Sequence, residues 1–328
     1  MGVAEDLVSV LGQLRGRMLA VFLQNNPDPD AIACGLGLQR VGEHVGVPST
    51  LYYGGRIGHH QTRAMVNLLR IRLQRVEGPE AAGEIVSEAA GAALIDAAVA
   101  ARYNLLPSDV TATIVIDHHQ VEEERVRGEF VDIRPRVGAA STIVTGYLQA
   151  LGIEPETNLA TALLYGIRSD THQYLRNFSE EDLRAVNFLT YLADLALIEE
   201  IEHPPMSKET VDVIGRAIRN REARGSYAVS SAEFISDRDA LPQAAEILIQ
   251  EEGVETALVF GITESQIHFS ARTRDPRVNV ASVLAEAFGA EHTGGHQTMA
   301  GGTIQLGFFE GTESRAELLA LTTETVRR

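Results

Sequence analysis

The stretch MLAVFLQNNPDPDA, residues 18–31, decides how the N-terminal half of the chain folds. Met18–Leu23 is an unbroken apolar run, as a fully buried strand requires. The Asn and Pro residues that follow predict a turn, and Ala31–Val45 has the small-residue pattern of a buried helix. The sequence therefore predicts a strand, a loop and a helix, with Asp28 and Asp30 in the loop.

The same order recurs further along the chain. Candidate strands lie at Thr50–Tyr53, Ala92–Ile95 and Thr113–Ile116, and a candidate helix lies at His60–Leu69. Alternating strands and helices are typical of a doubly wound, mainly parallel sheet with helices on both faces. Ligands bind at the carboxyl ends of the strands in such sheets. We therefore expect the acidic residues that follow these strands to meet at one edge.

The second half of the chain predicts a smaller α/β domain. Helical periodicity continues through Ser141–Leu151 and Leu159–Tyr165 to about Glu202, where His203-Pro204-Pro205 interrupts it. Beyond the interruption the patterns indicate a bridging helix, then strands and helices, at Ser207–Glu222, Ser226–Ser231, Ala244–Glu251, Thr256–Ile262, Gln266–Arg272 and Val280–Phe288, before a final strand and helix. We predict a catalytic domain over 1–202, a linker helix region over 203–225 and a smaller domain over 226–328.

The composition is that of a soluble, acidic protein. A chain of 328 residues with 45% hydrophobic content can bury two separate cores. The formal net charge of −17 opposes binding of long duplex nucleic acid, but small anionic substrates can bind where divalent cations supply positive charge. No apolar run suits a membrane span and the N-terminal segment is unlike a signal peptide, so we expect a cytoplasmic protein with no membrane partner.

Three segments carry carboxylates or imidazoles directly after predicted strands. Asp28 and Asp30 can each face a hard cation, or Asp can simply cap the following helix. Asp96 ends an apolar run where an unpaired carboxylate is costly to bury, although a helix cap is the plainer interpretation. In Asp117-His118-His119, imidazole beside carboxylate suits manganese or a similar metal, and the alternative is a polar turn.

Further candidates lie later in the chain. Asp170, within Gly166–Thr171, follows an apolar helix and offers another carboxylate. Ser141-Thr142 at a helix start can cap that helix or hold a phosphate. In the C-terminal domain, Arg272 and the run Gly294-Gly295-His296 can bind an anion or a base, because glycine lets the backbone approach closely. The alternative for the glycines is a hairpin turn.

Taken in order, these segments resemble a known family. Asn26–Ala31, Asp96, Asp117–His119 and Gly166–Thr171 resemble the four motifs of the DHH phosphoesterases. The run Gly294-Gly295-His296, with Ala300-Gly301, resembles the DHHA1 substrate-binding domain that accompanies them. The compact members that the chain resembles are nanoRNases, 3'-phosphoadenosine 5'-phosphate phosphatases, archaeal RecJ-like proteins and dinucleotide phosphodiesterases.

The resemblance implies a site for two Mn²⁺ ions in the cleft between the domains, with Mg²⁺ or Co²⁺ as alternatives. Asp96 would bridge the two ions and Asp28 would bind one of them. The other ion would be bound by Asp30, His118 and Asp170. Water activated by the ions would then attack phosphorus, without a covalent enzyme intermediate.

The resemblance also assigns the groups around the metals. His119 would face the substrate phosphate, and Asp117 would orient its neighbours, so that the catalytic set is Asp96, Asp117, His118 and His119. The substrate would be bound by His119 together with Arg272, Gly294, Gly295 and His296. One position departs from the family, because Gln24 stands where a histidine usually precedes the first motif aspartate. A glutamine carbonyl is a weak neutral ligand, so the Asp28 ion is in doubt.

These features predict metal-dependent hydrolysis of short oligoribonucleotides, linear dinucleotides or 3'-phosphoadenosine 5'-phosphate. The alternatives are a RecJ-like single-strand exonuclease, hydrolysis of pyrophosphate or polyphosphate, and a non-catalytic nucleotide-binding or replication-associated scaffold whose metal site is weakened by Gln24. The expected partner is a short nucleotide or oligonucleotide. The sequence leaves the oligomeric state open, a homodimer included.

Overall fold

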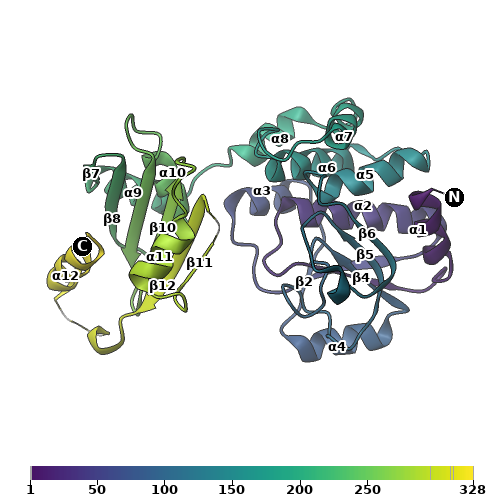
Figure 1. Cartoon of the computed structure of the whole chain (residues 1–328), viewed down its shortest axis with the longest axis horizontal. Helices are drawn as coiled ribbons and strands as arrows, with labels where there is room; N and C mark the ends of the chain where they lie inside the picture. The colour runs from purple at the N-terminus through teal and green to yellow at the C-terminus, as the bar shows by residue number, and fades with distance from the viewer. Residues whose placement is uncertain (1, 296, 311, 313, 328) are drawn as a thin grey trace. The chain divides into compact units, whose positions relative to one another are not determined.

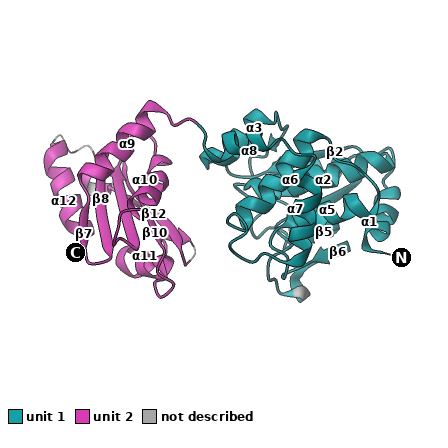
Figure 2. Cartoon of the chain, turned by 90° about the horizontal axis from the view of Figure 1, so that it is seen from above, with its two compact units in different colours: residues 1–204 teal, residues 205–328 magenta. Residues whose placement is uncertain are grey.

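The computed structural model describes residues 2–295, 297–310, 312 and 314–327, and Figure 1 shows how its helices and strands are arranged. The chain divides into two compact units, residues 1–204 and 205–328 (Figure 2). His296, a predicted substrate-binding residue, lies outside the described residues. Within the described ranges, no helix is both long enough and apolar enough to cross a membrane.

Unit 1, residues 1–204, is built on one sheet. Its strands are β1 (Leu19–Leu23), β2 (Ser49–Tyr53), β3 (Gln74–Arg75), β4 (Gly91–Ile95), β5 (Ala112–Asp117) and β6 (Gly128–Ile133). They lie in the order β3-β2-β1-β4-β5-β6, and neighbouring strands are parallel. The prediction of a doubly wound, mainly parallel sheet is confirmed. The order reverses between β1 and β4, and ligands bind at this kind of switch point.

Helices cover both faces of this sheet. They are α1 (Val3–Gly12), α2 (Pro29–Val45), α3 (His60–Leu68), α4 (Pro79–Glu88), α5 (Ala140–Ala150), α6 (Thr157–Asp170), α7 (Glu180–Thr190) and α8 (Leu195–Glu202). Val21 and Leu23 of β1 pack with α2, α5 and α6, whereas Phe22 packs toward α4 on the other face (Figure 1). Burial on both faces explains why the strand is an unbroken apolar run.

Two predicted boundaries in unit 1 are wrong in ways that affect the site. Asp30 lies in the first turn of α2 rather than in the preceding loop. Asp170 is the last residue of α6 rather than part of a segment that follows the helix. Ile167 is fully buried and keeps the apolar face of α6 intact, so the polar residues beside it do not end the helix. The sequence did not identify α1, α4, β3 and β6 as separate elements.

Unit 2, residues 205–328, contains a mixed sheet in the order β11-β12-β10-β9-β8-β7. Its strands are β7 (Glu222–Arg224), β8 (Tyr227–Phe234), β9 (Thr256–Ile262), β10 (Gln266–Thr273), β11 (Thr293–Gly295) and β12 (Met299–Gln305). Its helices are α9 (Lys208–Arg219), α10 (Ala240–Leu248), α11 (Val280–Phe288) and α12 (Arg315–Arg327). The expected smaller α/β unit is confirmed. The bridging helix ends at Arg219 rather than Glu222, because Glu222 begins β7.

The close packing of α6 against α2 and α5 depends on Gly166. A Cβ atom at this position would lie 2.6 Å from Ser141 Oγ and 3.2 Å from Ala33 Cβ and Asp30 Cα. We expect Gly166→Ala to lower the free energy of unfolding of unit 1 by about 1–3 kcal/mol, the usual cost of overpacking. Urea denaturation followed by circular dichroism measures this change.

Gly146→Ala in α5 is the matched control for Gly166→Ala. Nothing lies within 4 Å of a Cβ atom added at Gly146, and alanine is the better helix former. We expect this control to leave the stability unchanged or to raise it. If both variants were as stable as the wild type, the helices would be able to move apart without cost.

Candidate metal centre

The first acidic group follows β1. Asp28 is the N-cap of α2, and its Oδ1 accepts a hydrogen bond from the backbone nitrogen of Ala31 at 2.9 Å. Asp28 Oδ2 accepts a second hydrogen bond from Nε2 of Gln24 at 2.7 Å. The same Nε2 donates to Asp96 Oδ2 at 3.0 Å. The amide of Gln24 therefore joins the carboxylates that follow β1 and β4, on either side of the switch point.

Asp30 is held by the start of another helix. Its carboxylate is fully buried and accepts hydrogen bonds from the backbone nitrogens of Ala140, at 2.6 Å, and Ser141, at 2.8 Å. Both nitrogens belong to the first turn of α5, where helical amides have no partner within the helix. The helix dipole also favours negative charge there. The start of α5, which the sequence suggested as a cap or a phosphate site, thus binds the carboxylate of Asp30.

Asp96 lies at the centre of the cluster. Its backbone is left-handed, with φ 57°, a conformation that non-glycine residues adopt mainly at strained functional sites. One carboxylate oxygen, Oδ2, accepts the hydrogen bond from Gln24. The other, Oδ1, is buried and has no hydrogen-bond partner in the described part of the chain. Asp96 Oδ1 lies 3.4 Å from both His118 Nε2 and His119 Nδ1.

The His118 side chain, which follows β5, places one ring nitrogen among three carboxylates. Its Nε2 lies 3.2 Å from Asp170 Oδ2, 3.4 Å from Asp96 Oδ1 and 3.8 Å from Asp30 Oδ2. This Nε2 is buried without a hydrogen-bond partner among the described residues. The other ring nitrogen, Nδ1, lies 3.4 Å from the carbonyl oxygen of Val137, a contact that orients the ring as in many metal-binding histidines.

The electrostatics of this cluster call for positive charge. Burial, and then the charges of Asp96 and Asp170, raises the pKa of Asp28 well above its usual value. Burial and the neighbouring carboxylates likewise raise the pKa of Asp30 to about 7. Burial disfavours charge on His118, but the adjacent carboxylates outweigh it and raise the pKa of His118 to about 12. Each of these shifts reduces the excess of negative charge in the cluster.

Asp117 and His119 form a pair beside the cluster. Asp117 is buried, and its Oδ2 accepts a hydrogen bond from the backbone nitrogen of Ala98 at 2.7 Å. Its Oδ1 accepts from the backbone nitrogen of His119 and lies 2.9 Å from His119 Nδ1. This contact raises the pKa of His119 to about 10. The His119 side chain is 55% exposed, so its Nε2 is the ring nitrogen available to a substrate.

The donors fit one divalent cation. The ligand atoms of Asp30, His118 and Asp170 lie within 4.8 Å of one another. Carboxylate oxygens and an imidazole nitrogen form a set that Mn²⁺ and similar ions accept. Asp96, His118 and His119 form a second group of the same kind, and Asp96 Oδ1 lacks a hydrogen-bond partner among the described residues. On the Asp28 side, by contrast, the amide nitrogen of Gln24 already contacts both carboxylates.

A buried carboxylate that the sequence did not single out supports this arrangement. Asp182, in α7, accepts hydrogen bonds from the backbone nitrogen of Gly138 at 2.9 Å and from Thr142 Oγ1 at 2.5 Å. These two residues flank the amides of α5 that hold Asp30. Asp182 also completes a capping box with Ser179. The capping-box pattern was the available signal, but it indicates only a helix start.

Arg168, two residues before Asp170, contacts Glu202 and Tyr174. Arg168 makes two hydrogen bonds to the carboxylate of Glu202, at 2.9 and 3.0 Å, and its guanidinium carbon lies 5.7 Å from the centre of the Tyr174 ring. Arg168 therefore anchors α8 to α6. After Asp170 the chain makes a left-handed turn, in which residues 172–174 have positive φ.

Predicted substrate-binding residues of unit 2 line a cavity of about 360 Å³. Its lining includes Arg272 and Gly295, and also Arg238, which the sequence did not single out. Arg272 Nε donates to Glu246 Oε1 at 3.2 Å, so part of its charge is compensated. Gly294 and Gly295 lie in the strand β11 and pair with β12, so they are strand residues rather than the hairpin turn that the sequence offered as the alternative.

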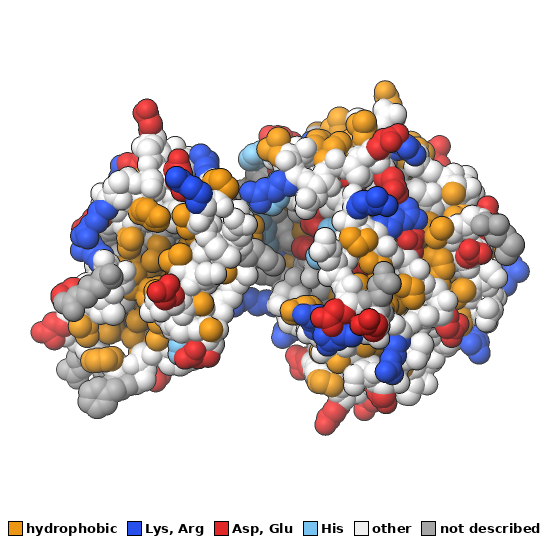
Figure 3. Space-filling view, viewed as in Figure 1, with side chains coloured by type: hydrophobic (Ala, Val, Ile, Leu, Met, Phe, Trp, Pro, Cys, Tyr) orange, Lys and Arg blue, Asp and Glu red, His pale blue; other side chains and the backbone are white. Residues whose placement is uncertain are grey.

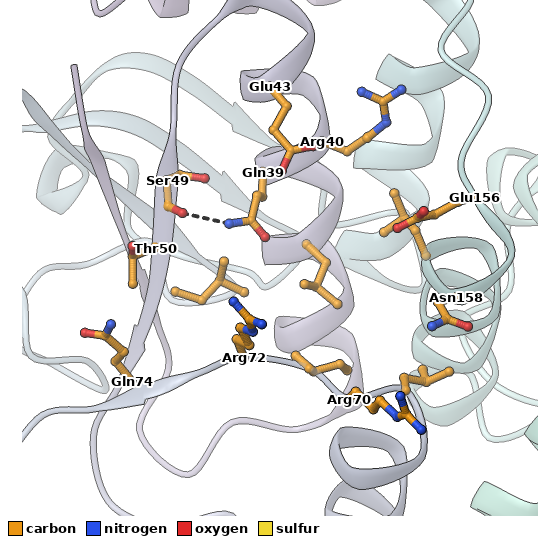
Figure 4. A pocket seen from close by; sticks show the side chains of 15 residues that line it. Gln39, Arg40, Glu43, Ser49, Thr50, Arg70, Arg72, Gln74, Glu156 and Asn158 are labelled. Atoms are coloured by element: carbon orange, nitrogen blue, oxygen red, sulfur yellow. Dashed lines mark hydrogen bonds between the residues drawn. The ribbon is translucent and has the colours of Figure 1, made fainter. Parts of the chain in front are cut away.

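A cavity of about 520 Å³ also lies in unit 1, at the start of β2 (Figure 4). Its lining comes from α2, β2, the segment 69–74 and the start of α6. Gln39 donates a hydrogen bond to the carbonyl oxygen of Ser49 there, at 2.7 Å (Figure 4). Most of its lining residues are polar, Arg40, Arg70 and Arg72 among them, and the acidic cluster contributes nothing to it. The candidate centre is therefore the cluster at the carboxyl ends of the strands.

Comparisons with known proteins add a domain match and a shared fold. Residues 224–328 match the DHHA1 domain. An uncharacterized protein of Methanocaldococcus jannaschii is 40% identical over 311 residues, which cover 94% of this chain and 62% of that protein. The chain thus spans less than two thirds of the length of this relative.

Two solved structures share the fold over nearly the whole chain. An exopolyphosphatase-related protein from Bacteroides fragilis superposes with a TM-score of 0.72 and 16% identity, covering 99% of this chain and 95% of that one. RecJ from Thermus thermophilus, in complex with Mn²⁺, superposes with a TM-score of 0.55 and 13% identity, covering 100% of this chain and 55% of that one.

Replacing Asp170 tests whether the cluster binds a cation. Its side chain is 20% exposed, so the change to a neutral amide should cost the fold little. We expect Asp170→Asn to weaken Mn²⁺ binding at least ~10-fold, or by about 1.4 kcal/mol, because a charged ligand is lost. Isothermal titration calorimetry of the chelator-treated protein measures this affinity.

Asp109→Asn removes the same charge at an exposed position outside the cluster and serves as the matched control. We expect its Mn²⁺ affinity to equal that of the wild type. Equal affinities in all three proteins would mean that Asp170 does not contact the ion.

Proposed function

Because the chain belongs to the DHH/DHHA1 phosphoesterase family, we propose that it hydrolyses phosphoester bonds in short nucleotide substrates with the help of a divalent cation. The resemblance seen in the motifs is confirmed by the DHHA1 match over residues 224–328 and by the shared fold. The observation that carries the proposal is a pair of buried atoms, Asp96 Oδ1 and His118 Nε2, that lie 3.4 Å apart without hydrogen-bond partners in the described chain.

The proposed roles follow from these positions. Asp30, Asp96, His118 and Asp170 would hold the cation, which in such sites activates water and neutralises charge on the phosphoryl oxygens. His119, held at Nδ1 by Asp117, would donate a hydrogen bond from Nε2 to a phosphate oxygen. The start of α5 keeps the carboxylate of Asp30 in place while the substrate binds.

The proposed substrate class is short and nucleotide-like. Figure 3 shows acidic and basic side chains interspersed over this face of both units, without a broad basic surface that would suit long duplex nucleic acid. In unit 2, Arg238 and Arg272 line the cavity of the DHHA1 domain, where they can meet the phosphate or base of a small ligand. Short oligoribonucleotides, linear dinucleotides and 3'-phosphoadenosine 5'-phosphate meet these requirements.

One observation favours a second candidate function. The hydrogen bonds of Gln24 to Asp28 and Asp96 weaken the case for a complete pair of metal sites. A nucleotide-binding protein without catalytic activity would need no such pair. Hydrolysis remains the better-supported proposal, because the donors around His118 could hold an ion that binding alone would not require.

An activity panel tests the proposal. The purified protein is incubated with Mn²⁺ and RNAs of increasing short length, a linear diadenylate, 3'-phosphoadenosine 5'-phosphate or pyrophosphate, and the released products are quantified. We expect turnover of at least one short nucleotide, and a loss of at least ~100-fold in Asp96→Asn, since this residue contacts the proposed ion site. Asparagine tolerates the left-handed backbone of residue 96, so the fold is preserved.

Asp109→Asn is the control here as well, and we expect it to retain full activity. Absence of turnover with every nucleotide, at low and at high salt, would contradict hydrolysis and favour the binding protein. Turnover that persists in Asp96→Asn would point to a contaminating enzyme.

A further inference from the structure

Gln24 makes an unusual contact for a residue beside a candidate metal centre. Its side-chain nitrogen donates to Asp28 Oδ2 at 2.7 Å and to Asp96 Oδ2 at 3.0 Å. An amide nitrogen carries two N–H groups and no acceptor, so these two carboxylates use its full donor capacity. Both hydrogen bonds are charge-assisted, which makes them about twice as strong as neutral ones.

The remaining oxygens of the two carboxylates also have defined roles. Asp28 Oδ1 accepts the hydrogen bond from Ala31 that caps α2, so both of its oxygens are engaged. Asp96 Oδ1 faces His118 Nε2, on the other side of the carboxylate. Asp96 therefore divides the centre in two, with Gln24 on one side and the histidine on the other.

We propose that Gln24 takes the place of a cation on the Asp28 side, so that the centre binds one divalent ion, on the His118 side. A cation at the position of the amide nitrogen would contact the same two oxygens that the N–H groups contact. This inference rests on the proposed metal centre, and it replaces the expectation of two Mn²⁺ ions. The single ion would be held by Asp30, His118 and Asp170, whose ligand atoms lie together, and Asp96 Oδ1 lies 3.4 Å from His118 Nε2 beside them.

Rotation of the Gln24 amide does not readily restore the second site. Rotation would place the amide oxygen against two carboxylate oxygens at hydrogen-bond distance, where like partial charges repel. A second cation would have to relieve this repulsion after two charge-assisted hydrogen bonds had been broken. We therefore expect any second ion to bind at least ~100-fold more weakly than the first.

Asp28 acquires a different role in this arrangement. It caps α2 through Oδ1 and orients Gln24 through Oδ2, so it is a positioning residue rather than a ligand. The Gln24 amide, fixed directly after the buried strand β1, holds Asp96 in the orientation that turns Oδ1 toward His118.

Metal stoichiometry tests the inference without reference to activity. The full chain is stripped with a chelator, dialysed against Mn²⁺ at increasing concentrations and analysed for bound metal, and electron paramagnetic resonance spectra are recorded. We expect one tightly bound ion per wild-type chain, with the spectrum of an isolated Mn²⁺. Gln24→Glu and Gln24→His each replace the amide with a metal ligand, and we expect two ions with a spin-coupled spectrum in at least one of them.

Gln39→His is the matched control, since it makes the same change in unit 1 at a residue whose amide donates to Ser49. We expect it to bind one ion. Two tightly bound, spin-coupled ions in the wild type would overturn the inference. One ion in the wild type and in both Gln24 variants would also overturn it, because Gln24 would not be what excludes the second ion.

These results are distinguishable from those of the activity panel. Two ions in an active wild-type enzyme would refute the inference and leave the proposed function standing. One ion in a protein that hydrolyses nothing would support the inference and contradict the function. Failure to bind any Mn²⁺ would overturn the metal centre itself, and with it this inference.

Discussion

Mutual repulsion among buried and partly buried carboxylates is the constraint on which the architecture of unit 1 depends. Asp28, Asp30, Asp96 and Asp170 converge near the carboxyl ends of the parallel strands. Such a group is tolerable only if each carboxylate receives hydrogen bonds or a nearby positive charge. The chain supplies backbone N–H groups to Asp28 and Asp30, and an amide to Asp96. What remains unsatisfied lies beside His118, where two buried atoms have no hydrogen-bond partner among the described residues and donor atoms able to hold a metal ion come together.

Residues well away from these donor atoms hold them in position. Asp182 fixes Gly138 and Thr142, which hold the first turn of α5, and that turn holds Asp30. Gly166 lets α6 approach the backbone of Asp30, and the same helix ends at Asp170. The positions of the ligand atoms are therefore set by the packing of α2, α5, α6 and α7 as well as by the strand ends. A change in this packing would displace the ligands without touching them.

Those features of unit 1 that have a local sequence pattern could be predicted from the sequence. The apolar run of β1, the turn after it and the Asp117-His118-His119 segment each follow from residue types and spacing, and they led to the parallel sheet and its ligand edge. Hydrogen bonds between distant residues have no such pattern. Gln24 and Asp96 lie 72 residues apart, and Asp182 lies 44 residues from Gly138. Gln24 therefore suggested a weak carbonyl ligand, whereas in the folded chain its nitrogen faces the carboxylates.

An amide in place of a cation changes the charge that the centre offers to a substrate. When ionised, Asp28, Asp30, Asp96 and Asp170 carry four negative charges, which two divalent ions would balance and one ion would leave half-compensated. A phosphodiester brings one further negative charge, whereas pyrophosphate brings several. Because like charges repel most strongly where burial lowers the dielectric, a one-ion centre disfavours pyrophosphate more than a diester. Among the proposed substrates, the charge balance thus favours the internucleotide bonds of short RNAs and linear dinucleotides over the more highly charged 3'-phosphoadenosine 5'-phosphate.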